Sequence, residues 1–193
     1  PYVYPTEPLI MTVTSHVDDE GAAMKIIGLD ENYNPISEVV TLAPTGTTTT
    51  QTAFFRINDV VCVNANGLAS GNPENDVVIS NSGTTYAKVR GGEGKNQASI
   101  YTVPAGHSFY LTRIDAFCAT AAQNNRQIYF RNFVFQENGV AFRVAETSFL
   151  ETMHINRKAP FRYAEKTDIQ FQLRGSAGEQ YISVFGEGIL VKN

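Results

Sequence analysis

The sequence predicts an all-β protein, an antiparallel β-sandwich with a jelly-roll-like strand order and an extended N-terminal arm. Three observations support this class. Apolar and polar residues alternate with a period of two in segment after segment. Turn-forming residues separate these segments at intervals of roughly 8 to 15 residues, as in sandwiches and barrels. No segment keeps a 3.6-residue period over three turns, so we expect few helices.

The clearest alternation is DIQFQLR at residues 168–174, where Ile169, Phe171 and Leu173 share one face. GVAFRVAE at residues 139–146 shows the same pattern. Such segments are typical of strands with one buried face. The other predicted strands are residues 9–15, 24–30, 37–43, 52–64, 75–81, 84–90, 126–136 and 181–191.

Glycine, proline and asparagine mark the connections between these strands. The pair Asn138-Gly139 predicts a hairpin, because both residue types tolerate the positive φ of a type I′ turn. In YTVPAGHSFYLTRI (residues 101–114), Pro104 cannot donate to a ladder and Gly106 permits a tight corner. We therefore expect a bend between two strands there. One short helical turn is expected near residues 146–156.

The chain of 193 residues suits one domain of ordinary size with an arm. Residues 1–8, PYVYPTEP, are too rich in proline for a regular ladder and are expected to form the arm, which leaves residues 9–193 for a single sandwich. Residues 44–52, PTGTTTTQT, are predicted to be an exposed loop or an edge. Cys62 and Cys118 lie in apolar β-rich runs and are expected to be buried thiols, with a disulfide as the alternative.

The charge of the chain argues against nucleic acid as a partner. The formal net charge is -4 and the pI is about 5.4, with lysine and arginine scattered along the sequence. A nucleic-acid groove needs a basic stripe that displaces counterions from phosphates. No run of 18 apolar residues is present, so no membrane span is expected either.

The search for catalytic residues begins with Gly106-His107-Ser108, which matches only the first half of a nucleophile elbow. The residues that follow continue as a strand. The other two histidines, His16 and His154, are far apart in sequence, and no pair has the short spacing of a zinc site. We predict no catalytic residue and no metal ligand.

Three other motifs fall short of ligand loops. The acidic residues 18–20 lack the alternate ligands of a calcium loop and are expected to form a solvated turn. Residues 91–96, GGEGKN, miss the spacing of a phosphate loop and have Asn96 where serine or threonine is needed. Residues 186–188, GEG, lack the third glycine of a dinucleotide site. We therefore expect no cofactor, and a structural or binding role is the leading interpretation.

Four stretches together carry a resemblance to a known class of proteins: residues 24–63, 99–114, 159–176 and 185–193. Within them, SIYTVPAGHSFYLTRI and EKTDI are the distinctive motifs, and the β-pattern between them is generic. Over most of its length the chain resembles β-rich virion structural proteins of tailed double-stranded DNA bacteriophages, especially those common in marine phages.

The resemblance implies a jelly-roll-like capsid decoration (cement) protein or minor capsid protein, made in the host cytoplasm and carried in the virion. It supplies no catalytic residue and no cofactor. The partners it implies are the major capsid protein or other virion proteins. Further copies of the chain are expected in a homotrimer, because cyclic symmetry matches the axes of a capsid lattice. A tail or fibre component is the alternative within the same class.

The arm is the predicted partner-binding segment, centred on Tyr2, Tyr4 and Pro5. Tyrosines provide a large contact area at low entropic cost, and an arm that is loose alone can order on a capsid. A terminus that stays disordered is the competing interpretation.

Two other functions remain open at this point. A carbohydrate- or receptor-binding module is the main rival, because aromatic side chains on a β-sandwich stack on sugar rings. An enzyme is the third possibility. It would require His107, His16 or His154 to converge with a carboxylate in a cleft.

Overall fold

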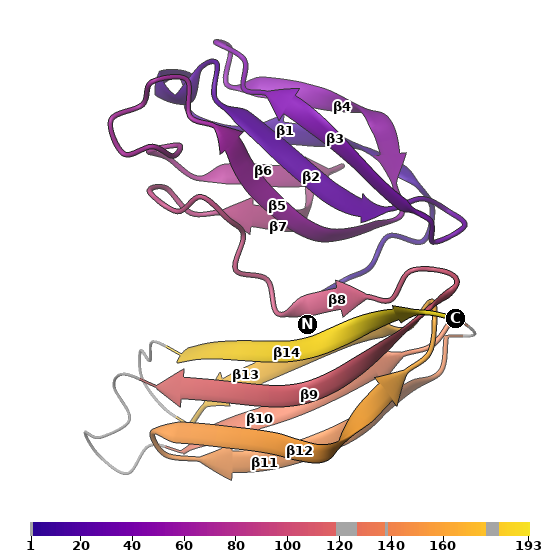
Figure 1. Ribbon diagram of the computed structural model, residues 1–193. Coiled ribbons are helices and arrows are strands. Elements are labelled where there is room, and N and C mark those ends of the chain that lie inside the picture. Colours follow the sequence, from indigo (N-terminus) through magenta and orange to yellow (C-terminus); the bar gives the residue numbers. More distant parts are fainter. Residues whose placement is uncertain (1, 119–126, 138, 177–181) are drawn as a thin grey trace. The chain divides into compact units, whose positions relative to one another are not determined.

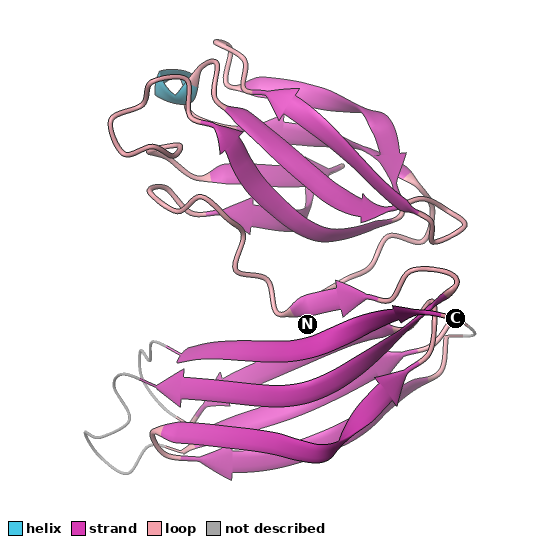
Figure 2. Cartoon of the chain, viewed as in Figure 1, coloured by secondary structure: helices cyan, strands magenta, loops and turns pink. Residues whose placement is uncertain are grey.

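A computed structural model describes residues 2–118, 127–137, 139–176 and 182–193. These residues form fourteen antiparallel strands in four sheets, and their only helical element is the 3₁₀ turn η1 (Val17–Asp19). Figure 2 shows how completely strands dominate the chain. The all-β class predicted from the alternating pattern is therefore confirmed. Within the described residues, no helix has the length and apolar character needed to cross a membrane.

The chain divides into two compact units: residues 2–98, the N-terminal unit, and residues 99–193, the C-terminal unit. Each unit contains two sheets that enclose a hydrophobic core of its own (Figure 1). A single sandwich over residues 9–193 is expected from the sequence, whereas the contacts divide the chain into two groups between Ala98 and Ser99. The polar stretch KNQAS at residues 95–99 marks this boundary.

The N-terminal unit has a four-stranded sheet of order β4-β1-β6-β7 and a three-stranded sheet of order β3-β2-β5. Met11 and Phe54 of the first sheet meet Met24, Ile26 and Val60 of the second, and all five are fully buried. The strands of this unit are β1 (Leu9–Thr14), β2 (Ala23–Leu29), β3 (Pro35–Thr41), β4 (Thr47–Phe54), β5 (Arg56–Asn64), β6 (Val77–Asn81) and β7 (Thr84–Val89).

The C-terminal unit pairs a sheet of order β11-β10-β13-β8 with a sheet of order β12-β9-β14. Phe130 and Ile128 of the first sheet pack with Leu111, Ile114 and Ala116 of the second. The strands of this unit are β8 (Ile100–Thr102), β9 (His107–Cys118), β10 (Ile128–Phe135), β11 (Ala141–Phe149), β12 (Thr152–Tyr163), β13 (Asp168–Gly175) and β14 (Ile182–Lys192).

The alternation of apolar and polar residues in the sequence corresponds to the buried and exposed faces of each sheet. On β10, Ile128, Phe130 and Val134 are buried, whereas Tyr129 and Arg131 point outward and are exposed. A strand alternates in this way because successive side chains leave opposite faces of the pleat. The outward side chains of the C-terminal unit are thus set by its core residues.

The bend predicted in YTVPAGHSFYLTRI is present. β8 ends at Thr102 and β9 begins at His107, with Gly106 at a φ of 70° between them. The backbone N–H of His107 donates to the carbonyl of Pro104 at 3.3 Å. A positive φ is strained for most residues other than glycine, so glycine is favoured at this corner.

Several local predictions change in the structure. The helical turn expected near residues 146–156 is wrong: β11 and β12 occupy that stretch, and their backbone groups pair with β10 and β9. The single strand expected over residues 52–64 is divided into β4 and β5 at Phe55. The threonine-rich segment 44–52 supplies most of β4, an edge strand. At the predicted hairpin, Gly139 has a φ of 78° and β10 pairs with β11, while Asn138 lies outside the described residues.

The two cores predict separate responses to core truncation. Phe54→Ala removes a buried ring from the N-terminal unit, and Phe130→Ala removes one from the C-terminal unit; each should cost about 3–5 kcal/mol. We expect hydrogen exchange to accelerate mainly within residues 2–98 for the first variant and within residues 99–193 for the second. Phe142→Ala, at a side chain that is 42% exposed, is the control and should leave both patterns unchanged. Equal acceleration across the whole chain in either core variant would contradict two independent cores.

Candidate functional site

The N-terminal arm, residues 2–8, lies against the N-terminal unit without joining a sheet. Tyr2 packs against the hydrophobic core of that unit, and the rings of Tyr2 and Tyr4 meet edge to face with centroids 4.9 Å apart. Pro5 is buried, whereas Val3 is 64% exposed. The structure thus brings the three predicted partner-binding residues together and holds them on the chain's own surface.

Arg56, the first residue of β5, fixes this arm. Its side chain is buried, and its Nη1 donates to the carbonyl oxygen of Pro5 at 2.9 Å. The guanidinium carbon lies 4.0 Å from the centroid of the Phe55 ring, 4.9 Å from that of Tyr4 and 5.6 Å from that of Tyr33. A planar, weakly hydrated cation can contact ring faces and donate to carbonyls at once. The arm is therefore held by one arginine and a group of aromatic rings.

Sequence reasoning missed Arg56. In TAFFRINDVVCVN it is one charged residue in an alternating run, and its partner Pro5 is 51 positions away. Only the folded chain brings the two together. The one feature of the sequence that could have suggested this contact is the presence of aromatic residues next to both Pro5 and Arg56.

The three histidines are engaged separately. His16 accepts a hydrogen bond from the backbone of Asp18 at the start of η1. His107 Nδ1 lies 2.8 Å from the carbonyl oxygen of Ala105. Ser108 is buried; its hydroxyl donates to Asn193 Oδ1 at 2.7 Å and accepts from Arg162 at 3.0 Å. The structure does not bring His107 and Ser108 together as a base and a nucleophile.

The third histidine, His154 on β12, contacts a buried carboxylate. Its Nδ1 lies 2.9 Å from Oδ1 of Asp115 on the central strand β9, and Arg113 Nε lies 2.7 Å from Oδ2 of the same group. The hydrogen bond from His154, ahead of that from Arg113, lowers the pKa of Asp115 and outweighs the burial that raises it. Asp115 and His154 are 39 positions apart, and the register between β9 and β12 is what places them side by side. The pair could therefore not be predicted from the sequence.

The acidic motif at residues 18–20 is hydrogen-bonded to the loop that contains Glu74 and Asn75. Asp19 is buried, and its two oxygens accept hydrogen bonds from the backbone N–H groups of Glu74 at 2.7 Å and Asn75 at 3.2 Å. Asp18 lies 3.0 Å from His16 Nδ1 on the surface. Among the described residues, no group of three or more His, Cys, Asp or Glu side chains is placed to hold a metal ion.

The two cysteines are both present as thiols. Cys62 is half-buried on β5 of the N-terminal unit, and Cys118 is buried at the end of β9 in the C-terminal unit. The disulfide that the sequence left as an alternative is not formed in this structure.

The outer surface of the β12-β9-β14 sheet carries four exposed apolar side chains, which we call the apolar face: Phe117 (42% exposed), Phe185 (56%), Ile189 (60%) and Val191 (43%). Phe185 lies opposite Asp115 in the register, and Ile189 lies opposite Tyr110. Both cross-strand partners point away from the core. The apolar face therefore lies on the outer side of β9 and β14, with Glu187 between Phe185 and Ile189.

Strand β14 is also the edge of its sheet. Along its described residues it pairs with β9 on one side only. An edge strand presents a row of backbone N–H and C=O groups that can pair with another chain. Exposed apolar side chains and an open edge thus occur on the same strand.

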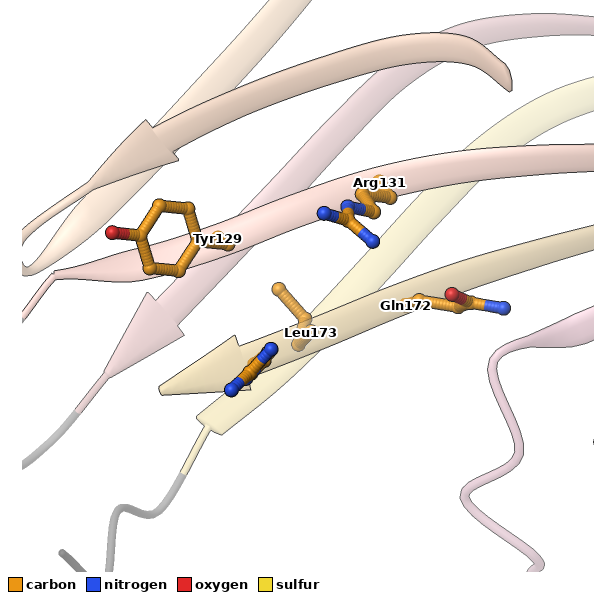
Figure 3. Close-up of a pocket in the computed structure, with 5 residues that line it drawn as sticks. Tyr129, Arg131, Gln172 and Leu173 are labelled. Carbon is orange, nitrogen blue, oxygen red and sulfur yellow. The ribbon is translucent and has the colours of Figure 1, made fainter. Parts of the chain in front are cut away.

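A small pocket lies on the other sheet of the C-terminal unit, between β10 and β13 (Figure 3). Its volume is about 220 Å³, and it is lined by Tyr129, Arg131, Gln172, Leu173 and Arg174. The register places Tyr129 opposite Arg174 and Arg131 opposite Gln172. Four polar or aromatic side chains from two neighbouring strands therefore share one outward-facing site. No motif in the sequence marks these side chains as a site.

Comparisons with protein-family models, with curated proteins and with solved structures found no match to this chain. The phage resemblance drawn from the sequence motifs therefore stays a prediction.

Arg56→Lys is predicted to release the arm. Lysine keeps the positive charge but loses the planar guanidinium that contacts the rings while donating to Pro5. We expect a loss of about 1–3 kcal/mol in the free energy of unfolding and faster proteolysis within residues 2–8. Arg90→Lys, at an exposed arginine of the same unit, is the matched control. An arm as protected in Arg56→Lys as in wild type would show that it is held by other contacts.

The lowered pKa of Asp115 predicts a loss of stability in acid. A carboxyl group whose pKa is lower in the folded state stabilises the fold above its unfolded pKa of about 3.9, and this contribution disappears as the pH falls through the folded pKa. Urea unfolding from about pH 5 to about pH 2 should therefore show a steeper decline for wild type than for Asp115→Asn. His154→Gln should move the NMR titration of Asp115 upward. A titration unchanged by His154→Gln would rule out His154 as the main cause.

Proposed function

We propose that this chain is a non-enzymatic structural protein of a tailed bacteriophage particle, a capsid decoration or minor capsid protein that binds and stabilises the assembled head lattice. The observation that carries the proposal is the apolar face together with the open edge of β14. The motif resemblance is the reason for proposing a phage particle as the place where this chain acts. The surface of the C-terminal unit is the reason for proposing that the chain attaches to other proteins there.

The apolar face has the character of a protein interface. Phe185 and Ile189 are more than half exposed on a strand whose sheet already has a complete core on its other side. Contiguous exposed apolar patches on folded proteins mark interaction sites. Burying such side chains removes apolar surface from water at roughly 25 cal/mol per Å². A partner that covers this face would gain that energy.

The edge of β14 adds directional contacts. A partner strand that pairs with it would satisfy backbone groups in register, and alternate side chains would meet the apolar face. Glu187 and Lys192 lie on the same strand. Charges on an edge strand discourage unspecific pairing, so they favour a partner with a complementary surface.

The expected partners are the major capsid protein, other virion proteins and further copies of this chain in a homotrimer. A protein that binds the assembled lattice and not its free subunits stabilises that lattice by mass action. A trimer on a lattice axis multiplies weak contacts through avidity. The two rigid cores keep the ordering cost of docking low.

The arm is proposed as a second contact with the particle. Val3 is exposed beside Tyr2 and Tyr4, and Arg56 fixes the path of the chain. The sequence predicts an arm that becomes ordered on the capsid. The hydrogen bond from Arg56 to the Pro5 carbonyl supports an arm that is already ordered before it binds, which would lower the entropic cost of binding.

The pairing within the C-terminal unit supports a jelly-roll-like assignment for it. β8 pairs with β13, β9 with β12, and β10 with β11. These nested pairs are those of a long hairpin wound into a roll, and β14 adds to β9 as a further strand. Such units are common in viral capsid proteins.

Charged substitutions on the apolar face test this proposal. Phe185→Asp and Ile189→Asp should each reduce occupancy on purified phage particles at limiting protein by about tenfold, which corresponds to ~1.4 kcal/mol. Light scattering should show a trimer for wild type and dissociation in the variants if the same face joins copies. Val63→Asp, at a valine that is 51% exposed on β5, is the matched control. Full occupancy and unchanged assembly in both apolar-face variants would refute the proposed attachment.

A further inference from the structure

The pocket between β10 and β13 combines an aromatic ring with cationic and amide groups. Tyr129 and Arg174 lie opposite each other in the register, beside the opposed pair Arg131 and Gln172. Figure 3 shows the Tyr129 ring and the Arg131 side chain on β10 and the Gln172 amide on β13. Leu173 supplies an apolar surface to the same pocket. These are groups that hold a small polar ligand with one apolar side.

The side chains on β10 are fixed before any ligand arrives. The Tyr129 hydroxyl donates to Gln127 Oε1 at 3.1 Å, and Gln127 Nε2 donates to the Ser148 hydroxyl at 2.7 Å. Arg131 Nε donates to Glu146 Oε1 at 2.9 Å, and Arg143 pairs with the same carboxylate. Preorganised side chains lower the entropic cost of binding.

The charge of this surface is positive although the chain is acidic overall. Two of the five residues that line the pocket are arginines, Arg131 and Arg174, and none is acidic. Arg131 and the neighbouring Arg143 both pair with the carboxylate of Glu146. Among the described residues, Arg174 makes no hydrogen bond and no ion pair, so its guanidinium is available to a ligand. A guanidinium binds a carboxylate with two parallel hydrogen bonds.

We propose that this pocket binds a sugar that carries a carboxylate, a uronic or sialic acid unit. Pockets for drug-sized ligands measure roughly 300–1,000 Å³, so a volume of about 220 Å³ suits a single sugar ring. Arg174 would hold the carboxylate, Gln172 and Arg131 would bond hydroxyl groups, and the Tyr129 ring would contact the apolar face of the sugar. A bare phosphate would leave the tyrosine unused. An acidic peptide would need an extended groove, whereas this pocket is small and is lined by five residues of two strands.

The site does not depend on the proposed attachment to a capsid. It lies on the β11-β10-β13-β8 sheet, whereas the apolar face lies on the β12-β9-β14 sheet. The two proposals can therefore fail separately.

The test is NMR and calorimetric titration of the full chain with glucuronic acid, galacturonic acid and N-acetylneuraminic acid, with glucose and galactose as neutral probes. At least one acidic sugar should bind with a Kd of about 10 mM or tighter, as expected for a single ring. Shifts should centre on residues 129–131 and 172–174, and the matching neutral sugar should bind at least about tenfold more weakly.

Three variants assign the roles. Arg174→Ala and Tyr129→Ala should each weaken binding by about tenfold or more, and Arg174→Lys should retain only part of the affinity. Both positions are exposed, so the near-UV circular dichroism of the fold should persist. Arg90→Ala, at an exposed arginine of the N-terminal unit, is the control and should bind as wild type does.

Four outcomes would overturn the proposal. These are no binding of any acidic sugar at about 50 mM, equal affinity for acidic and neutral sugars, unchanged affinity in Arg174→Ala, or tighter binding of inorganic phosphate or triglutamate than of every acidic sugar. The last result would indicate a site that binds anions without recognising the sugar ring.

Discussion

Burial of one side of every sheet against an opposing sheet is the constraint on which both units depend. In the C-terminal unit it is concentrated in β9, which pairs with β12 and β14 and sends Leu111, Ile114 and Ala116 into the core. Because side chains alternate, the same strand must present Asp115 and Phe117 outward. The buried carboxylate and the apolar face both follow from this arrangement.

A sandwich of few strands cannot hide all of its edges and outer surfaces. The two sheets of the C-terminal unit handle these surfaces differently. The β12-β9-β14 sheet leaves apolar side chains on an edge strand, whereas the β11-β10-β13-β8 sheet carries arginines and a tyrosine on its outer side. The first surface suits a protein partner and the second suits an anionic ligand with an apolar side. The two proposed recognition surfaces therefore lie on different sheets of the same unit.

The N-terminal unit stabilises its arm by a different means. Arg56 is a buried cation within a β-rich core, and the rings of Phe55, Tyr4 and Tyr33 lie close to its guanidinium and stabilise the charge. Tyrosine and phenylalanine can fill this role because their ring faces carry negative electrostatic potential. An arm rich in proline has few backbone donors to pair in a sheet. Side chains and the Pro5 carbonyl contribute to holding it in place.

The sequence by itself determined the all-β class, most of the strands, the corner at Gly106 and the exposed position of the β4 edge. These features depend on neighbouring residues, since alternation and φ preferences are local. The tertiary structure alone decided the split into two cores, the contact between Arg56 and Pro5, the pair formed by Asp115 and His154, and the pocket around Tyr129 and Arg174. Each of these depends on strand order and register, which bring together residues far apart in the chain, and no local pattern encodes that alignment.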